Sequence, residues 1–494
     1  MRFRLWLLLI ANVLCLPLVV CADKLTIRED DGTEVTIEAR WIGERKGVIV
    51  LERADGRIEL VPQPQIINRE PADDPEPVSC ETIVERLKEE FGAELFRAQI
   101  SAPYVVGLIL SEPLPKNCEN RATNCLKKGA TFMKNVEKAF LEFAKELKFP
   151  VEEKTKYPLT LLIFETDDDF TKFTTKETGG RGLSAGAILG YYSPLTNRLV
   201  IRMSECHSMS TPLHEAIHQQ CFNRGFIQRL APVPAWFVEG IATGFEGNSD
   251  KINGKRPLQV NKSYIRAAIR ARTVDWDDVV ADDAAFRGDV LAGEAYGNAW
   301  SIHWFLVTKY RKQYIEYLKV LSQKKPLESD DATARVEDFE RVFGNTIGKL
   351  QSEFPAWIEN AAKKQNIPLV EPVPVGRMVS QSNLAEVELT AAKAGSRADV
   401  ESEGRMRNLS QIRPMSFHIT LETSGGTYAE WYLRKVDPQK VIQLEKQMAR
   451  KRMKNAPANQ PAETFRIRVR STVPDSATDR AWSRGQLPTP IFSG

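Results

Sequence analysis

The stretch that decides the fold is residues 211–218, which read Thr-Pro-Leu-His-Glu-Ala-Ile-His. The threonine and proline at its start suit the cap and first turn of a helix, where the missing proline N–H costs no hydrogen bond. On such a helix His214 and His218 lie four residues apart and project from one face, so both imidazoles can reach a single metal ion. Glu215, the next residue round the helix, can accept a proton from water beside that metal. The alternative is a pair of core histidines that stack by chance.

A third metal ligand is expected from residues 234–242, Pro-Ala-Trp-Phe-Val-Glu-Gly-Ile-Ala. The proline begins a second helix, and Glu239 is a carboxylate within an otherwise apolar stretch. A buried carboxylate without a partner is costly, whereas a carboxylate that binds zinc is satisfied. Three protein ligands leave the fourth position of a tetrahedral zinc for water, as in a catalytic site. The alternative partner of Glu239 is an arginine such as Arg224 or Arg229.

These stretches resemble the motifs of the gluzincin clan of zinc metallopeptidases, the relatives of thermolysin and aminopeptidase N. Residues 214–218 and Asn223 match the first motif of the clan, and residues 236–242 and Glu246 match the second. Residues 294–301, Glu-Ala-Tyr-Gly-Asn-Ala-Trp-Ser, look like the helix that carries the clan's oxyanion-stabilising tyrosine. Three matched elements make a chance pair of histidines the weaker interpretation.

The resemblance is specific over about residues 200–310 and implies a zincin-like peptidase domain over residues 80–365. Such a domain is α+β, with a mixed sheet and a helical half. The sequence is most similar to secreted bacterial gluzincin-like proteins whose substrates are unassigned.

The resemblance also implies a role for each matched residue at the centre of the site. His214, His218 and Glu239 would bind Zn²⁺, and Glu215 would be the general base. Tyr296 would donate a hydrogen bond to the oxyanion that develops during peptide hydrolysis. The alternative for Tyr296 is a core aromatic side chain of its helix.

Two further residues would act around the metal ligands. Asn223 and Glu246 would form hydrogen bonds in the shell around the zinc site, with Asn223 orienting either its helix or a ligand. Two other histidines, His207 and His303, are interpreted as structural.

One segment departs from the aminopeptidases of the clan. Those enzymes carry a Gly-Ala-Met-Glu-Asn segment whose glutamate holds the free amine of the substrate. Here residues 186–190 read Gly-Ala-Ile-Leu-Gly, and Leu189 stands where that glutamate would fall. Because an apolar side chain cannot pair with an ammonium group, we expect an endopeptidase. Its substrate would add as a strand to an edge formed by residues 198–203.

The N-terminus indicates export. Arginines at positions 2 and 4 precede an apolar run over residues 5–20, and small residues follow before Asp23. This order is typical of a secretory signal peptide, which we place at residues 1–22. The alternative is an uncleaved anchor, for which the run is slightly short. We therefore expect a secreted, periplasmic or cell-envelope protein whose mature chain has no membrane span.

The whole chain of 494 residues has room for about three domains. Alternating apolar runs broken by two Asp-Gly turns predict hairpins, and the first segment looks like the small Src-homology-3-like barrels of secreted proteins. We expect this barrel over residues 23–66, a linker rich in proline and acidic residues over 67–79, the peptidase domain over 80–365 and a β-rich module over 375–494.

The C-terminal module is expected to contain one charged helix over residues 438–454. Basic residues crowd the end of this helix. They could contact an anionic surface, or they could simply be solvated side chains favoured by the helix dipole. Neither interpretation assigns a function to the module.

Five cysteines follow the signal peptide, and Cys118 and Cys125 are the easiest disulfide to propose. Lys and Arg number 68 against 65 for Asp and Glu, a net charge of +3. A charge so near balance predicts no nucleic-acid partner, because phosphate binding needs a concentrated basic face. The partner expected is a peptide or protein substrate.

The sequence therefore predicts an exported zinc metallopeptidase. The alternative class is a secreted binding or cell-envelope interaction protein that keeps the peptidase fold without turnover. All catalytic residue types are present, which favours the enzyme.

Overall fold

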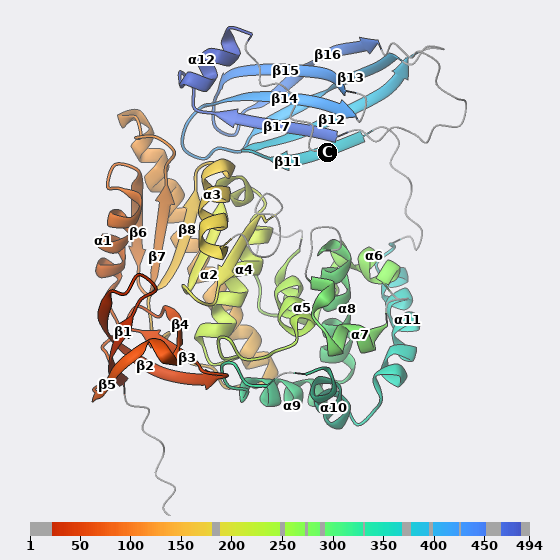
Figure 1. The fold of residues 1–494 in the computed structure, drawn as a ribbon. Helices are drawn as coiled ribbons and strands as arrows, with labels where there is room; N and C mark the ends of the chain where they lie inside the picture. Colours follow the sequence, from red (N-terminus) through yellow and green to blue (C-terminus); the bar gives the residue numbers. More distant parts are fainter. Residues whose placement is uncertain are drawn as a thin grey trace, which may run out of the picture. The chain divides into compact units, whose positions relative to one another are not determined.

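The computed structural model describes residues 22–179, 188–247, 252–271, 275–286, 292–329, 331–367, 377–394, 399–423, 426–450 and 466–485. These residues form a mixed α and β protein with several sheets (Figure 1). The chain divides into two compact units, residues 1–77 and 78–494. The predicted signal peptide lies outside the described residues except for Ala22, which begins the first strand. No helix among the described residues is both long and apolar enough to cross a bilayer.

The N-terminal unit is one antiparallel sheet of five strands in the order β4-β3-β2-β1-β5. Buried apolar residues such as Leu25, Ile37 and Leu51 form its core, and Gly32 and Gly56 take positive φ angles in the two predicted turns. Within the described residues β4 and β5 are the two edges of the sheet, so the predicted barrel is not a closed one. The strands are β1 (Ala22–Arg28), β2 (Glu34–Arg45), β3 (Val48–Arg53), β4 (Ile58–Pro62) and β5 (Ile66–Ala72).

The predicted linker begins later than residue 67. The segment Ile66–Ala72 is strand β5, which pairs with β1 from Ile66 opposite Ile27 to Ala72 opposite Ala22. Pro71 is tolerated because β5 is an edge strand, where a missing N–H need not interrupt the sheet. The first part of the predicted linker is therefore an edge strand, although it contains proline and acidic residues.

The second unit begins with a mixed five-stranded sheet in the order β6-β7-β8-β10-β9. Its central strand is apolar except for Thr160 and is buried along its length, which is typical of a strand covered on both faces. It runs parallel to both of its neighbours. The strands are β6 (Phe96–Ser101), β7 (Tyr104–Ile109), β8 (Leu159–Phe164), β9 (Gly190–Ser193) and β10 (Arg198–Arg202).

Helices cover both faces of this sheet (Figure 1). On one face α1 (Cys80–Phe91) and α3 (Asp167–Thr178) pack against Phe96, Leu162 and Phe164. On the other face lie α2 (Glu119–Leu147) and α4 (Ser210–Asn223), over residues such as Val106 and Leu161. This arrangement lays α4, the helix of the His-Glu motif, directly on the sheet.

The prediction that residues 198–203 form an edge of the sheet is wrong. Residues 198–202 form β10, which lies between β8 and β9 and so is paired on both sides. β9 and β10 form an antiparallel hairpin, and its first strand, β9, occupies the edge of the sheet. The edge of the described sheet next to α4 is therefore Gly190–Ser193.

A helical half follows the sheet. Large aromatic side chains fill its core, among them Trp236, Trp300 and Tyr314. α5 packs so closely on α8 that a Cβ at Gly240 would lie 2.5 Å from the carbonyl oxygen of Ala299, which excludes a side chain there. The helices are α5 (Ala235–Phe245), α6 (Lys262–Ala271), α7 (Trp276–Ala281), α8 (Ala292–Lys309), α9 (Arg311–Ser322), α10 (Ala332–Phe343) and α11 (Ile347–Lys364).

The C-terminal region is β-rich, as predicted. One sheet has the strand order β11-β12-β13-β16 and the other β15-β14-β17. Residues from both sheets, such as Leu389 and Phe417, share one apolar core. The elements are β11 (Arg377–Ser382), β12 (Ala385–Ala394), β13 (Asp399–Asn408), β14 (Met415–Thr423), β15 (Gly426–Val436), β16 (Val441–Arg450), β17 (Arg466–Thr472) and α12 (Ala477–Ser483).

The helix predicted over residues 438–454 is wrong over its described part. Strand β16 occupies Val441–Arg450 and pairs antiparallel with β13. Buried Leu444 alternates with exposed neighbours, which is the period of a strand, and pairing with a distant strand overrides the helix propensity of the charged residues. The basic residues from Lys451 onward lie outside the described residues.

A buried ion pair ties the C-terminal region to the mixed sheet within the second unit. The Arg413 Nε atom lies 2.5 Å from Oε1 of Glu165, and both side chains are almost completely buried. Ser111 also donates its backbone N–H and its hydroxyl to Glu165. A charge pair enclosed in this way is satisfied only while both partners are present.

The described cysteines are all free thiols, so the Cys118–Cys125 disulfide is wrong. The segment between these two cysteines is the start of α2, with Cys118 at its cap and Cys125 within it. Seven helical residues rise about 10 Å, which exceeds the Cα separation of about 7 Å that a disulfide can bridge.

Candidate metal centre

Helix α4 carries the two histidines of the motif. It begins at Ser210, one residue before the predicted cap, because the Thr211 hydroxyl donates to Oε2 of Glu205 instead of capping the helix. His214 and His218 project from the same face of α4, and both imidazoles are about 7% exposed. Their Nε2 atoms lie 3.0 Å apart.

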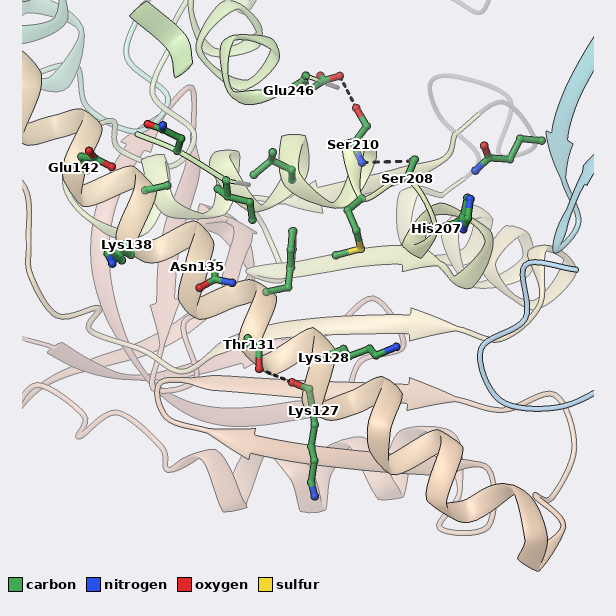
Figure 2. Close-up of a pocket in the computed structure, with 18 of the residues that line it drawn as sticks. Lys127, Lys128, Thr131, Asn135, Lys138, Glu142, His207, Ser208, Ser210 and Glu246 are labelled. Atoms are coloured by element: carbon green, nitrogen blue, oxygen red, sulfur yellow. Dashed lines mark hydrogen bonds between the residues drawn. The ribbon is translucent and has the colours of Figure 1, made fainter. Parts of the chain in front are cut away.

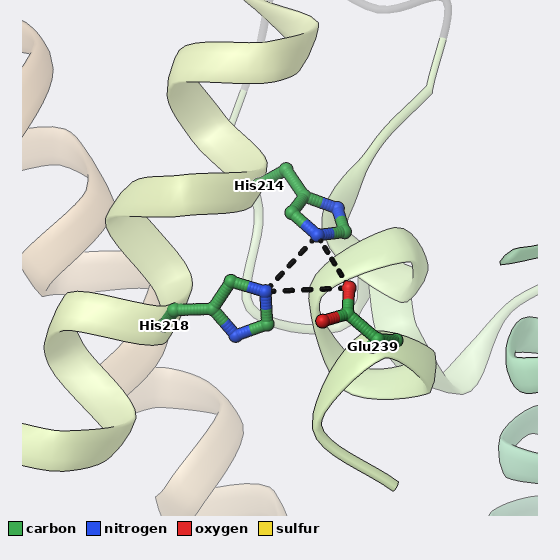
Figure 3. A group of neighbouring side chains, drawn as sticks. All are labelled: His214, His218 and Glu239. Carbon is green, nitrogen blue, oxygen red and sulfur yellow. Dashed lines mark hydrogen bonds and ion pairs between the residues drawn. The ribbon is translucent and has the colours of Figure 1, made fainter. Parts of the chain in front are cut away.

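Helix α5 brings Glu239 to the two imidazoles (Figure 3). Oε2 of Glu239 lies 2.8 Å from Nε2 of His214 and 3.4 Å from Nε2 of His218. All three potential ligand atoms lie within 4.8 Å of one another. Bonds of about 2.0 to 2.1 Å to a tetrahedral zinc would hold such atoms about 3.3 Å apart, so these side chains fit one zinc ion.

The alternative partners of Glu239 lie elsewhere. Arg224 is fully buried and forms an ion pair with Glu137 on α2. The guanidinium of Arg229 donates to the carbonyl oxygen of Pro194 at 3.3 Å. The carboxylate of Glu239 therefore faces the two histidines.

The charge balance of the cluster favours a cation at this point. Burial alone would raise the pKa of Glu239, but the imidazoles of His218 and His214 outweigh it and hold that pKa below its ordinary value. Burial alone would lower the pKa of His214, yet Glu239 and Glu246 together raise it well above its ordinary value. Protons or a metal cation can supply the positive charge that the carboxylates stabilise.

Glu246 contacts Nδ1 of His214, the ring nitrogen opposite the one that faces Glu239. Its Oε1 lies 2.7 Å from Nδ1 of His214. An Nδ1–H that donates to this carboxylate leaves the lone pair of Nε2 free for a metal, which is the arrangement of carboxylate–histidine–zinc sites. The structure thus places the predicted outer residue Glu246 in direct contact with a predicted ligand.

Two side chains that the sequence did not single out hold Glu246 in turn. The hydroxyls of Ser210 and Tyr264 donate to its Oε2 at 2.8 and 2.9 Å. Asn261 donates to the backbone carbonyl of Glu246 at 2.8 Å. Tyr264 lies on α6 and belongs to no recognisable motif, so no signal in the sequence could have found it; Ser210 could have been suggested only by its place at the start of α4.

Glu215 is anchored to the edge strand of the sheet. The backbone N–H of Tyr192 on β9 donates to its Oε2 at 2.9 Å. Burial raises the pKa of Glu215 against the opposing effect of His214 and His218, which moves the carboxylate toward the range of a general base at neutral pH. One oxygen is fixed by the sheet, and the sequence did not reveal this backbone contact.

Tyr296 lies beside the metal ligands. Its ring meets the ring of His214 edge to face, with 5.4 Å between the centroids. The negative charge of Glu239, together with burial, raises the pKa of Tyr296, so its hydroxyl keeps its proton and can donate it in a hydrogen bond. Both predicted interpretations describe this residue in part, since it packs as an aromatic and is also adjacent to the site.

Asn223 is not brought to the ligand atoms by any described contact. Its side chain exchanges hydrogen bonds with Asn197 at 2.8 and 2.9 Å and donates to the hydroxyl of Tyr192 at 3.3 Å. These contacts join the end of α4 to the β9–β10 hairpin. Of its two predicted roles, Asn223 fits the one that orients the helix.

The two histidines interpreted as structural lie in packed surroundings. His303 is fully buried, accepts from the hydroxyl of Tyr314 at 2.8 Å and donates to the carbonyl of Pro257 at 3.2 Å. His207 accepts a hydrogen bond from Arg407 at 3.0 Å. Neither residue belongs to the three-residue cluster of potential metal ligands.

The segment that replaces the amine-binding glutamate is described from residue 188. Leu189 precedes β9 and is 42% exposed. Gly186 and Ala187 lie outside the described residues. Glu205, the nearest carboxylate before α4, is buried and accepts the hydrogen bond from Thr211, so its Oε2 is already engaged.

Comparisons with known proteins add little to this geometry. No curated protein matches the chain. Among solved structures, an aminopeptidase A of Legionella pneumophila in complex with aspartic acid is 11% identical with a TM-score of 0.24, and covers 72% of this chain. The variable domain of the AgI/II polypeptide BspA of Streptococcus agalactiae is 12% identical with a TM-score of 0.12, and covers 25% of this chain and 85% of its own.

This chain spans only 35% of the length of the aminopeptidase. Both TM-scores are too low to establish a shared fold. The chain's residues 208–328 match a family described as "Protein of unknown function (DUF1570)". That segment contains the three potential metal ligands and also Glu215 and Tyr296. The match therefore covers the part of the chain that carries the candidate site.

Proposed function

We propose that the protein is a zinc-dependent peptidase of the gluzincin type, in which His214, His218 and Glu239 hold Zn²⁺. The observation that carries the proposal is the convergence of two imidazoles and one carboxylate from two helices, with Glu246 behind His214. Two histidines and one glutamate are a ligand set of catalytic zinc, whereas structural sites are commonly rich in cysteine.

A bound zinc ion would supply a Lewis acid that polarises the substrate carbonyl and makes water acidic. Glu215 then accepts a proton from water and passes it to the nitrogen of the leaving amine. The Tyr192 N–H fixes one oxygen of Glu215, which leaves the other oxygen for this transfer. Tyr296 donates a hydrogen bond from its hydroxyl to the oxygen on which charge develops.

We propose that cleavage is internal rather than stepwise from the N-terminus. Leu189 offers no charge to a free amine at the start of the edge strand, and Glu205 is engaged by Thr211. The edge strand is β9, so an extended substrate would add there rather than to β10. Strand addition uses backbone hydrogen bonds and needs no free terminus. Export, which a signal peptide over residues 1–22 would direct, belongs to the same proposal.

The second candidate is a binding protein that keeps this cluster without turnover. It is favoured only by the exposed apolar residues beside the edge strand, Leu189 and Leu195, which suit a docked chain as well as a substrate. Metal content does not separate the two candidates, because both would bind zinc.

Activity separates them. Full-length protein loaded with zinc is incubated with a broad peptide library, beside the Glu215→Gln variant. The amide keeps the size and the Tyr192 contact but cannot take up a proton at neutral pH, so hydrolysis should fall by at least about 100-fold while zinc and fold remain. Equal cleavage by the variant would remove Glu215 from the mechanism. No cleavage by the wild type would favour the binding protein.

A further inference from the structure

A large cavity lies behind the metal centre. Its volume is about 1370 Å³, and it is lined by one side of α2, by the start of α4 and by Glu246, with Gln381 and Glu386 contributed by β11 and β12. Glu246 contacts Nδ1 of His214, whereas Nε2 of the same ring faces Glu239. The cavity is therefore adjacent to the metal centre but separate from the side where the metal ligands meet. Its volume exceeds the usual range of pockets for one small molecule.

Helix α2 presents a polar stripe to this cavity. Lys128, Thr131, Asn135 and Lys138 all line it, at intervals of three and four residues that keep them on one face of the helix. Figure 2 shows these residues in order along the helix, with Ser208, Ser210 and Glu246 across from them. A third lysine, Lys127, lines the same cavity.

Among the charged side chains that line the cavity, the carboxylates have hydrogen-bond or ion-pair partners and the lysines do not form ion pairs within the described residues. Within the described residues none of Lys127, Lys128 and Lys138 forms an ion pair, and Lys128 and Lys138 are exposed. The carboxylates have partners: Glu246 is held as described above, and Glu142 accepts from the backbone of Gly254 at 3.2 Å. Glu386 lies 3.9 Å from Arg407. The unpaired charge that faces the cavity is therefore positive.

We propose that this cavity binds an extended, acidic segment of polypeptide. Lys128 and Lys138 are ten helical residues apart, a rise of about 15 Å. An extended chain covers about 15 Å in four or five residues, so two carboxylates with that spacing can each meet one lysine. Between the lysines, Asn135 offers hydrogen bonds to the backbone of the segment. The Thr131 hydroxyl donates to the carbonyl oxygen of Lys127 and can accept a further bond.

A spaced acidic peptide fits this lining better than a continuous polyanion does. The three carboxylates among the lining residues would repel phosphates or sulfates placed at every repeat, whereas uncharged residues between two acidic ones can lie beside them. The net charge of the whole chain is only +3, so no broad basic face adds to the cavity. This binding goes beyond the proposed hydrolysis and holds or fails independently of it.

The test is direct binding measured by fluorescence anisotropy. The probes are a labelled peptide with two glutamates about five residues apart and its twin with glutamines. The protein is the full chain with Glu215→Gln, so that hydrolysis does not consume the probe. The acidic peptide should bind about fivefold tighter than its twin, because each exposed ion pair contributes about two- to fivefold. The difference should shrink as salt is added.

Charge reversal locates the site. Lys128→Glu with Lys138→Glu should abolish the preference, whereas Lys145→Glu, an exposed lysine of α2 outside the cavity lining, should leave it intact. Lys138→Gln, a milder change, should halve the preference or more and serves if the double variant unfolds. Equal affinity for both peptides would overturn the proposal, as would equal loss with Lys145→Glu. Tighter binding of a polyphosphate than of the acidic peptide would overturn it in favour of a polyanion.

Discussion

Glu246 and His214 form a carboxylate–imidazole pair, with Oε1 2.7 Å from Nδ1, that fixes which nitrogen of the ring faces Glu239. The pair joins residues 32 positions apart, from the end of α5 and the start of α4. Since the hydroxyls of Ser210 and Tyr264 hold the second oxygen of Glu246, the carboxylate has little freedom to turn away. The orientation of His214, a potential metal ligand, therefore depends on three helices.

Replacing Glu246 should weaken zinc binding although all three proposed ligand residues remain in place. Glu246→Gln keeps the size but removes the charge that orients and polarises His214, so zinc affinity should fall by about 10- to 100-fold. Competition with a fluorescent chelator measures this. Glu142→Gln is the matched control, because Glu142 lines the same cavity but contacts only the Gly254 backbone. Equal affinities in all three proteins would show that Glu246 does not support the ligand.

Purified protein should contain about one zinc per chain, because its three ligand atoms fit a single tetrahedral ion. His218→Ala removes one of them and should lose most of the metal in elemental analysis. His207→Ala should retain it, since His207 contacts Arg407 instead. If His218→Ala kept the zinc of the wild type, the assigned ligand set would be wrong.

A peptide and its N-acetylated twin should give the same internal products. Binding through the backbone of β9 requires no free amine, and Leu189 provides no carboxylate to hold one. Mass spectrometry of the products over time makes the comparison. Stepwise trimming of the free peptide alone would mean that another carboxylate near the edge strand binds the amine.

His303 should make the protein sensitive to acid. Burial lowers the pKa of His303 to about 3, while the unfolded chain keeps a value of about 6.5. Because the folded pKa is lowered, the neutral form is the one that stabilises the fold. This stability is complete above about pH 6.5 and is lost as pH falls toward 3, by up to about 1.4 kcal/mol per pH unit.

The measurement for His303 is the unfolding midpoint as a function of pH. Between pH 6.5 and 4.5 the midpoint of the wild type should fall more steeply than that of His303→Gln, which has no proton to take up. His207→Gln, at a partly exposed position, should follow the wild type. Parallel curves for the wild type and His303→Gln would contradict the role of the buried imidazole.

The proximity of His214, His218 and Glu239 could be predicted because their geometry is nearly local. A four-residue spacing on one helix fixes His214 against His218, and the second motif identifies Glu239 on a short following helix. The buried strand β8 and the β-rich C-terminus could be predicted for a similar reason, since their apolar patterns depend on the segment itself. Each of these features follows from the residue pattern of its own segments.

Features that depend on distant partners could not be predicted. Tyr264 reaches Glu246 from a separate helix, and the backbone N–H of Tyr192 that holds Glu215 carries no side-chain signal at all. Whether β9 or β10 forms the edge depends on which strand pairs with β8, and β16 is a strand only because β13 lies beside it. Local propensity and alternation cannot specify such pairings.

The absence of a side chain at Gly240 has a consequence for how this site tolerates sequence change. The residue follows Glu239 directly and lies against Ala299 and His303 of α8, so any larger residue would push α5 away from the backbone of α8 at Ala299. Such a displacement would carry Glu239 with it, while the two histidines on α4 stayed in place. A substitution at a position with no chemical role would thus disturb the site, because the alignment of its helices depends on the absence of a single methyl group.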